Sequence, residues 1–301
     1  MPGTELILAL DIGGTKIAAG LVDADGRLIH REQRPTPPAD AETIWATVET
    51  VIGSVLTAVD GAVVTGVGIA SAGPIDLPAG TVSPINIPEW QCFPIVDRVA
   101  ARTGLPVRLA GDVVCLTLGE HWRGAAQGAR FVLGMVVSTG VGGGLVFDGA
   151  PYLGRTGNAG HIGHVVVQAG GPSCACGGHG CVEAIASGPS LVRWARGHGW
   201  AGHDAEALAA AAIAGDEVAI RAFARGADAI AAAIASTAAV CDLDLVVLGG
   251  GVAGAGEVLF GPLRDRLGYY TGLDFLRGLR VVPAALGVDA GLVGAAALCR
   301  P

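Results

Sequence analysis

The chain has 301 residues, of which 51% are hydrophobic and only 15% are charged. Such a chain is long enough for one large domain or two smaller ones, and its composition excludes a largely disordered protein. The formal net charge of −8 argues against nucleic acid or an anionic membrane surface as a partner.

The N-terminal part of the chain predicts a β-hairpin that opens an α/β domain. Residues 1–5 lead directly into an apolar stretch, with neither a basic segment nor a cleavage site, so we expect no targeting segment. Asp23–Gly26 is a hairpin signal between apolar runs. The strands predicted in this part are residues 6–10, 17–22 and 27–33. The spacing that follows predicts a helix at 41–58, a strand at 63–70, a helix at 95–103, a strand at 107–110 and a helix at 113–126.

The second half of the chain repeats this plan. Residues 131–138 form a predicted strand, and a glycine-rich turn at 139–144 joins it to a strand at 145–147. After a cysteine-rich insertion, the pattern predicts helices from about residues 190, 205 and 217, a strand at 245–248, a helix near 257–267, a strand at 280–282 and a helix at 291–299. The longest apolar runs, 131–147 and 229–241, are too short to span a membrane.

The repeated plan predicts two similar domains that face a cleft. We place the first at residues 1–120, joined by the C-terminal helix at 288–301. The second covers residues 121–287 and includes a loop insertion at 157–183. Each domain would open with a β-hairpin whose turn is rich in glycine.

Three glycine-rich turns follow predicted strands, at residues 11–15, 138–143 and 249–251. Their backbone N–H groups and hydroxyls are suited to binding phosphate oxygens. The first two turns lead into a strand, so they match neither the P-loop nor the Rossmann fingerprint. Taken alone, each of these two turns is better explained as an ordinary hairpin turn. Together they favour a nucleotide that lies across the cleft.

Asp112 lies between a predicted strand and a predicted helix. Aspartate is a favoured N-cap residue, so one interpretation is purely structural. The other is a general base that takes the proton of a substrate hydroxyl as it attacks a phosphoryl group. The local sequence is compatible with both.

Three of the seven cysteines lie within eight residues, at positions 174, 176 and 181. An odd cysteine count and this short spacing favour a metal site in a reducing compartment over a disulfide framework. Three thiolates and one imidazole form a tetrahedral set that zinc prefers, and a complete set of protein ligands indicates a structural zinc. The candidate imidazoles are His161, His164 and His179. His179 lies inside the cysteine loop, and we expect it to face solvent.

These motifs together resemble the ROK family of sugar kinases and sugar-sensing repressors, within the actin-like ATPase superfamily. The resemblance covers nearly the whole chain, and its most specific part runs from Gly163-His164 through the three cysteines to Glu183. It implies an α/β fold of two actin-like ATPase (ribonuclease H-like) domains around a central cleft, with a zinc-binding loop insertion. By this match the zinc ligands are His164, Cys174, Cys176 and Cys181.

The resemblance also implies ATP and Mg²⁺. The nucleotide-side residues that it indicates are Asp11, Gly13, Gly14, Thr15, Lys16, Thr139, Gly140, Gly142, Gly249, Gly250 and Gly251. Asp11 would lie near the metal ion through water, and residues 249–251 would close over the adenosine. Asp112 matches the family's catalytic base, which deprotonates a primary hydroxyl, typically at C6, for in-line attack on the γ-phosphoryl group.

On the sugar side, the residues implied by the resemblance are Gly73, Asn86, Gly111, Asp112, His161, His164 and Glu183. Two positions depart from the family pattern, because Gly111 replaces an asparagine and His161 replaces a glutamate. A carboxylate only accepts hydrogen bonds, whereas a neutral imidazole both donates and accepts. The change favours an acceptor such as an N-acyl amino sugar or a C7-cyclitol. Glucose, with water filling the altered contacts, is an equal alternative.

Three functions compete, namely an ATP-dependent sugar kinase, a sugar-responsive repressor and a non-catalytic sugar-binding regulatory protein. A repressor would need an N-terminal DNA-binding domain, and only five residues precede the first predicted strand. Retention of Asp11, the phosphate turns and Asp112 argues against a non-catalytic protein. We therefore expect a cytoplasmic kinase that forms a homodimer or homotetramer.

Overall fold

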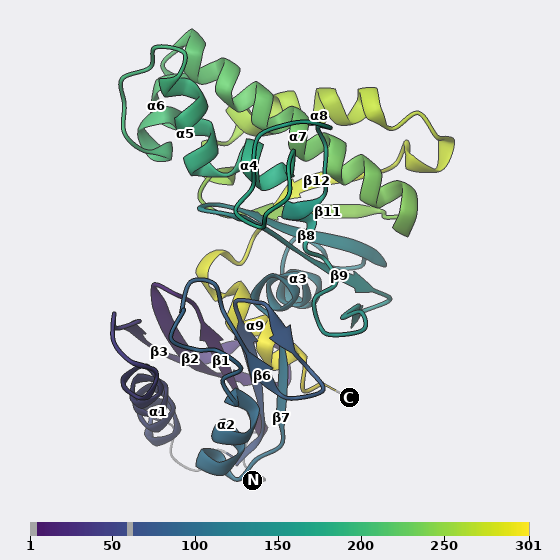
Figure 1. The fold of residues 1–301 in the computed structure, drawn as a ribbon. Coiled ribbons are helices and arrows are strands. Elements are labelled where there is room, and N and C mark those ends of the chain that lie inside the picture. The colour runs from purple at the N-terminus through teal and green to yellow at the C-terminus, as the bar shows by residue number, and fades with distance from the viewer. Residues whose placement is uncertain (1–4, 59–62, 301) are drawn as a thin grey trace. The chain divides into compact units, whose positions relative to one another are not determined.

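The computed structural model describes residues 5–58 and 63–300 (Figure 1). The prediction about a targeting segment concerns residues 1–4, which lie outside the described residues. The chain divides into two compact units, the first from the described residues of 1–128, 144–159 and 285–301, and the second from 129–143 and 160–284. This division differs from the predicted domains by placing residues 121–128, 144–159 and 285–287 in the first unit. The predicted domain boundaries and the central cleft stay predictions.

The sheet of the first unit has the strand order β3-β2-β1-β4-β7. Its strands are β1 (Glu5–Ile12), β2 (Lys16–Asp23), β3 (Leu28–Pro35), β4 (Val63–Ser71) and β7 (Val107–Gly111). The antiparallel pairs β1–β2 and β2–β3 form the predicted hairpins, and β4 is parallel to both β1 and β7. The first three strands are therefore connected by the two hairpins that the sequence predicts. A short hairpin of β5 (Ile75–Asp76) and β6 (Thr81–Val82) lies apart from this sheet.

Helices cover both faces of this sheet (Figure 1). They are α1 (Ala41–Thr57), α2 (Ile95–Thr103), α3 (Asp112–Arg123) and α9 (Ala290–Ala297). Alternate side chains of β1, from Leu6 to Ile12, join the apolar core formed with α1 and α2. On the opposite face, Ile7 and Cys299 lie near Gly66, and Leu292 of α9 lies near Gly20. Asp11 has the same parity as Ile7, so its side chain is on the face that α9 covers.

The second sheet has the order β10-β9-β8-β11-β12. Its strands are β8 (Phe131–Val137), β9 (Val141–Phe147), β10 (Ala150–Pro151), β11 (Leu245–Gly249) and β12 (Arg280–Pro283), and β11 is parallel to β8 and β12. The helices are α4 (Val182–Ala186), α5 (Gly188–Arg196), α6 (Ala205–Ile213), α7 (Glu217–Cys241) and α8 (Glu257–Tyr270), and α7 and α8 lie side by side (Figure 1). No helix within residues 5–58 and 63–300 is long and apolar enough to cross a membrane.

The helix predicted at 113–126 ends at Arg123, and the short elements β5, β6, β10 and α4 were not predicted. The largest difference from the predicted elements is the strand after the second glycine turn, because β9 begins at Val141 and not at residue 145. The predicted turn therefore shortens to Ser138–Gly140. The glycines of this strand allow close packing and do not form the turn. A Cβ at Gly143 would lie 2.6 Å from the carbonyl oxygen of Gly160, and a Cβ at Gly144 would lie 2.6 Å from Cα of Val114.

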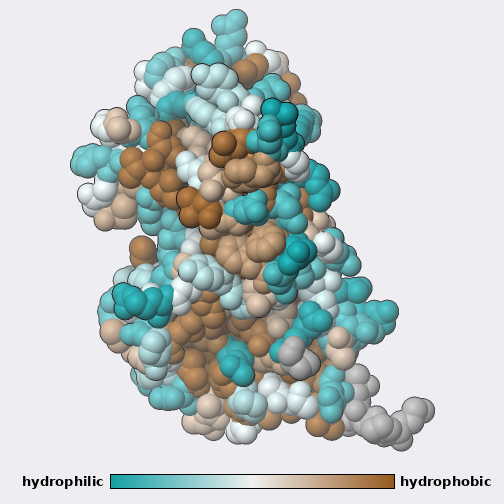
Figure 2. Space-filling view, turned by 90° about the vertical axis from the view of Figure 1, so that its right-hand side faces the viewer, coloured by the Kyte–Doolittle hydropathy of each residue, from teal (hydrophilic) through white to brown (hydrophobic). Residues whose placement is uncertain are grey.

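Hydrophobic side chains gather in several areas of the surface, among hydrophilic ones (Figure 2). The exposed large hydrophobic residues include four at the end of α8 and just after it, namely Tyr269, Tyr270, Leu273 and Phe275. Arg266 of α8 lies over both tyrosine rings and pairs with Asp228 of α7. The predicted homodimer or homotetramer stays a prediction.

Candidate active site

The first glycine turn joins β1 to β2 in the first unit. The backbone N–H of Gly13 donates to the carbonyl of Lys16 at 3.0 Å, which closes the turn. Thr36 contacts the turn through its hydroxyl, which donates to the carbonyl of Gly13 at 2.6 Å, and through its N–H, which donates to Thr15. A Cβ at Gly14 would lie 2.6 Å from the carbonyl oxygen of Asn86. The structure therefore brings a predicted nucleotide-side residue against a predicted sugar-side residue.

Two carboxylates lie near this turn. Burial raises the pKa of Asp11, and the positive charges of Lys16 and Arg31 partly offset this effect. Asp112 is the first residue of α3, and its Oδ1 accepts the N–H of Val113 at 2.8 Å. Asp112 is exposed at the surface of its unit. The surrounding protein nevertheless limits its hydration and, with a smaller contribution from the charge of Asp11, raises its pKa to about 6.

The N-cap interpretation of Asp112 is wrong. The N-cap of α3 is Gly111, and no side chain caps the helix. Asp112 is instead in the first helical turn, where a carboxylate is electrostatically favourable. Its raised pKa is typical of a general base, because proton transfer is most effective when the pKa lies near the working pH.

The second glycine turn, Ser138–Gly140, lies between β8 and β9 in the second unit. The N–H of Ser138 donates to the carbonyl of Gly140 at 2.8 Å, and the N–H of Gly188 donates to the carbonyl of Ser138 at 2.8 Å. Thr139 at the tip is exposed. The start of α5 therefore fixes this turn, and the hydroxyl of Thr139 is left accessible to a ligand.

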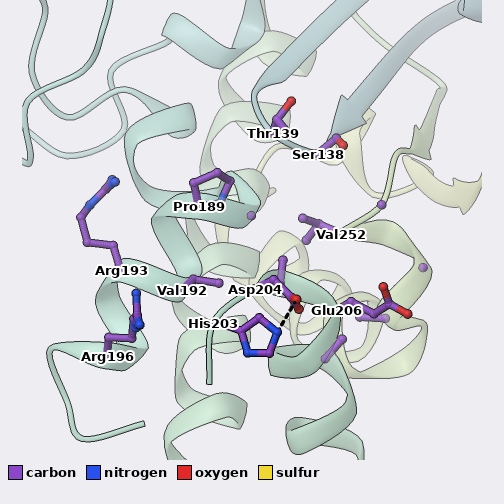
Figure 3. A pocket seen from close by; sticks show the side chains of 16 residues that line it. Ser138, Thr139, Pro189, Val192, Arg193, Arg196, His203, Asp204, Glu206 and Val252 are labelled. Atoms are coloured by element: carbon purple, nitrogen blue, oxygen red, sulfur yellow. Dashed lines mark ion pairs between the residues drawn. The ribbon is translucent and has the colours of Figure 1, made fainter. Parts of the chain in front are cut away.

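A cavity of about 750 Å³ opens beside this turn, wholly within the second unit. This volume is within the range of small-molecule sites. Figure 3 shows Ser138 and Thr139 at one end of the cavity, with Arg193 and Arg196 along α5. The residues that line the cavity are Ser138, Thr139, Gly188, Pro189, Val192, Arg193, Arg196, His203, Asp204, Ala205, Glu206, Ala209, Gly251, Val252, Gly254 and Ala255.

The third glycine turn also meets this cavity. Gly250 has a φ of +93°, and a Cβ there would overlap the carbonyl oxygen of Val137, so the turn requires glycine. The N–H of Val252 donates to the same carbonyl at 3.0 Å. Among the predicted nucleotide-side residues of the second unit, Thr139 and Gly251 line the cavity, whereas Gly140, Gly142, Gly249 and Gly250 do not.

The cavity residues from α5 and α6 were not predicted as site residues from the sequence. Arg193 donates to the hydroxyl of Ser190 at 2.9 Å, which fixes its guanidinium. Asp204 is the N-cap of α6 and pairs with His203 at 3.1 Å. The only sequence signal for this wall was the spacing of Arg193 and Arg196, which places them on one side of a helix.

The structure brings the four predicted zinc ligands together in the second unit. One ligand atom each of His164, Cys174, Cys176 and Cys181 lies within 4.8 Å of the others. His179 is outside this group, is exposed, and its ring nitrogen lies 3.4 Å from the hydroxyl of Ser173. Burial and the neighbouring thiols raise the pKa of Cys181 to about 12. The backbone N–H of Gly178 instead lowers the pKa of the exposed Cys176. A thiol such as Cys181 needs a nearby cation to ionise, so the donor set fits zinc.

His161 lies beside this cluster. Its ring centroid is 6.2 Å from that of His164, and the two rings are nearly parallel. Burial and then His164 lower the pKa of His161, and Glu183 raises it by a smaller amount. A neutral imidazole at this position therefore keeps one donor and one acceptor. The predicted sugar-side residues belong to two units, with Gly73, Asn86, Gly111 and Asp112 in the first and His161, His164 and Glu183 in the second.

Two α/β units that each open with a β-hairpin and a glycine turn define a protein of the actin-like ATPase type. Residues 7–301 match the model of the ROK family, and the chain belongs to this family. A glucokinase of Thermotoga maritima is 37% identical over 317 residues, which cover 100% of this chain and 98% of the relative. An N-acetylmannosamine kinase of Citrobacter koseri is 35% identical over 294 residues, covering 97% and 98%.

A solved structure gives the same comparison in three dimensions. The ROK family glucokinase from Streptomyces griseus, in complex with glucose and AMPPNP, has a TM-score of 0.80 to this chain. It is 36% identical, and the match covers 97% of this chain and 98% of that one.

Proposed function

We propose that this protein is an ATP-dependent sugar kinase that phosphorylates a primary hydroxyl of a hexose or hexose-like acceptor. The observation that carries the proposal is Asp112, a carboxylate at the start of α3 whose pKa is raised to about 6. Relatives named glucokinase and N-acetylmannosamine kinase match the chain over nearly its full length.

Asp112 acts as the general base. Its carboxylate accepts the proton of the acceptor hydroxyl while that oxygen attacks the γ-phosphorus atom in line with the departing ADP. The bond between the γ-phosphorus and the bridging oxygen breaks, and ADP carries its electron pair. The protein contributes chiefly by orienting the hydroxyl and by taking its proton.

The nucleotide would bind to both units. We assign the cavity of the second unit to the adenosine, and the Ser138–Gly140 turn to phosphate oxygens, because its hydroxyls lie at one end of that cavity (Figure 3). The turn at Gly13–Thr15 would bind phosphate from the first unit. The charge of Asp11 contributes to the raised pKa of Asp112, and a cation beside Asp11 would offset this repulsion. The carboxylate of Asp11 would bind Mg²⁺, and this ion would neutralise part of the phosphate charge.

Zinc would be bound by His164, Cys174, Cys176 and Cys181, with a structural role. The neighbouring His161 would then face the acceptor with a neutral imidazole. Its N–H suits a carbonyl or ring oxygen, which favours an N-acyl amino sugar as a second candidate acceptor beside glucose. One relative is named N-acetylmannosamine kinase, which agrees with this candidate.

The test is an ADP-release assay with ATP and Mg²⁺ against glucose, mannose, N-acetylglucosamine, N-acetylmannosamine, allose, fructose and a carbocyclic sugar analogue. We expect ADP release that depends on one of these acceptors. The replacement His161→Glu should raise kcat/KM for glucose relative to the preferred acceptor, since it supplies a carboxylate that accepts from hydroxyls. Absence of acceptor-dependent ADP release with every sugar would contradict the kinase function and favour a non-catalytic sugar-binding protein.

A further inference from the structure

Glu120 is a buried carboxylate that the proposed reaction does not use. Its exposed fraction is 0%, and it lies in α3, two turns after Asp112. A carboxylate removed from water loses its hydration, so protein groups must replace it. The protein groups that hydrogen-bond to Glu120 therefore show which parts of the fold this side chain joins.

Three backbone N–H groups donate to the carboxylate of Glu120. Its Oε1 accepts from Ala285 at 2.9 Å and from Leu286 at 2.8 Å, and its Oε2 accepts from Ala125 at 2.7 Å. Gly124 lies against Oε2, and a Cβ at that position would overlap it. Hydrogen bonds to an ionised acceptor are stronger than those between neutral groups. Glu120 therefore fixes the end of α3 to the beginning of the segment at 285–289.

That segment leads directly into α9, which packs tightly against α3. A Cβ at Gly119 would overlap the carbonyl oxygen of Ala290, and a Cβ at Gly294 would overlap the carbonyl oxygen of Cys115. Helices whose backbones touch in this way have little freedom to shift without steric conflict. The position of the start of α9 is thus set both by helix packing and by Glu120.

The start of α9 in turn contacts a predicted site residue. A Cβ at Gly291 would lie 2.7 Å from Oδ2 of Asp11. Asp112 begins α3, whereas Asp11 is a residue of β1 whose side chain lies against α9. A shift of α9 relative to α3 would therefore change the space that the carboxylate of Asp11 occupies.

We propose that Glu120 is a positioning residue for phosphoryl transfer, which fixes α9 against α3 and thereby keeps Asp112 and Asp11 in their reactive arrangement. This inference rests on the proposed kinase function, because it concerns the placement of the proposed base. A displacement of about 1 Å at a reacting group costs on the order of 100-fold in rate. Loss of a hydrogen bond to Glu120 that lets α9 shift slightly against α3 therefore has a measurable effect on turnover.

The titration of Asp112 reports on this placement independently of turnover. Asp11 acts on Asp112, and Lys16 and Arg31 act on Asp11. The thiol of Cys115 interacts with both carboxylates and with the thiol of Cys299. Burial raises the pKa of both thiols, so they stay neutral through the range in which Asp112 titrates. The pKa of Asp112 therefore depends on its hydration and on its distance from Asp11.

The test is the variant Glu120→Gln. The amide preserves size, but it places an N–H donor where one backbone N–H needs an acceptor. We expect kcat to fall about 10- to 100-fold, with the KM values for ATP and sugar changed less than about 3-fold. We also expect the pKa of Asp112, measured by ¹³C NMR of its carboxyl carbon, to fall from about 6 toward 3.8 as the carboxylate gains hydration.

Val48→Ala is the matched control. Val48 is buried in α1, on the sheet face opposite α9, so its truncation lowers stability without changing the contact between α3 and α9. At a comparable loss in Tm, this variant should keep the wild-type kcat and the wild-type titration of Asp112. Wild-type values in both measurements for Glu120→Gln would overturn the inference.

Failure of the proposed function is distinguishable from failure of this inference. If the wild-type protein phosphorylates no sugar, the NMR titration alone still decides on Glu120. If Glu120→Gln does not fold, Glu120→Asp retains the charge and shortens the side chain by one methylene. An unchanged Asp112 titration in that variant overturns the inference, and a lowered pKa supports it.

Discussion

The Oε2 atom of Glu183 accepts a hydrogen bond from the backbone N–H of Val141 at 2.9 Å. Glu183 belongs to α4, directly after the last cysteine of the cluster, and Val141 begins β9 directly after the Ser138–Gly140 turn. Gly140 lies against the same carboxylate, since a Cβ there would be 2.7 Å from Oε2. One side chain therefore connects the cysteine loop with the turn that we assign to the phosphates of ATP.

This connection predicts different effects for two variants of Glu183. Glu183→Ala leaves the N–H of Val141 without its acceptor, so we expect the KM for ATP to rise about 10-fold. Glu183→Gln keeps a carbonyl acceptor for Val141 and should raise only the KM for the sugar. Steady-state kinetics with each substrate varied in turn would separate these effects. A wild-type KM for ATP in Glu183→Ala would contradict the connection.

The pKa of Asp112 predicts the pH dependence of turnover. Only the ionised carboxylate accepts a proton, so kcat/KM for the sugar, which reports the pKa of the base in the free enzyme, should fall as the pH drops below about 6. Asp112→Asn should lower kcat at neutral pH by about 1000-fold or more, because it removes the base. The measurements are kcat/KM for the sugar against pH and kcat of the variant at neutral pH, with circular dichroism to confirm the fold of the variant. Wild-type turnover in Asp112→Asn would exclude this role.

The same carboxyl group predicts a cost in stability. Its pKa in the folded protein is raised above the ordinary value of 3.8 to about 6. The folded state therefore binds the proton more tightly than the unfolded state, and wild-type stability declines as the pH rises through this interval. Asp112→Asn cannot ionise, so its Tm should exceed that of the wild type at pH values above about 6. This difference should disappear below about pH 4, where both side chains are neutral.

The cysteine cluster predicts a bound zinc ion. We expect about one zinc per chain by elemental analysis, and markedly less in Cys181→Ser. Loss of the metal leaves the crowded thiols without a shared cation, so we expect Tm to fall by about 5 °C or more. His179→Ala is the control, because His179 lies outside the cluster and should leave both zinc content and Tm unchanged. A zinc content near zero in the wild type would rule out this assignment.

Close backbone packing predicts that Gly163 does not tolerate a side chain. A Cβ there would overlap the carbonyl oxygen of Val141, so Gly163→Ala should lower the free energy of unfolding by about 1–3 kcal/mol. Gly268, within α8, has no neighbouring atom within 4 Å of such a Cβ. Gly268→Ala should therefore stabilise the protein by about 0.5–1 kcal/mol through helix propensity. Denaturant unfolding of both variants tests the contrast, and equal effects would contradict the packing argument.

Much of the fold could be predicted because its strands and helices have clear apolar periods. The first hairpin and the helices from residues 188, 205 and 217 agree closely with the sequence pattern. The start of β9 could not be predicted, because Val-Gly-Gly-Gly has the composition of a turn. Its extended form depends on contacts with residues distant in sequence, such as Gly160, and these are not encoded in the local pattern.

The candidate site was predictable to different degrees. The four zinc ligands could be predicted because their spacing is specific, and the structure brings them together. The N-cap interpretation of Asp112 could be excluded only by the observed start of α3, and its role as general base stays a prediction. The wall formed by Pro189, Val192 and Asp204 could not be predicted, because it combines parts of separate helices that share no motif.

The placement of α9 has a consequence for biosynthesis. This helix contributes one covering of the first sheet, yet its residues 290–297 are translated long after those of β1, residues 5–12. Until α9 emerges from the ribosome, the face of β1 that bears Ile7 and Asp11 lacks this covering. We therefore expect the first unit to finish folding only after Ala297 has emerged, and a nascent chain stalled before Ala290 to expose this face to chaperones.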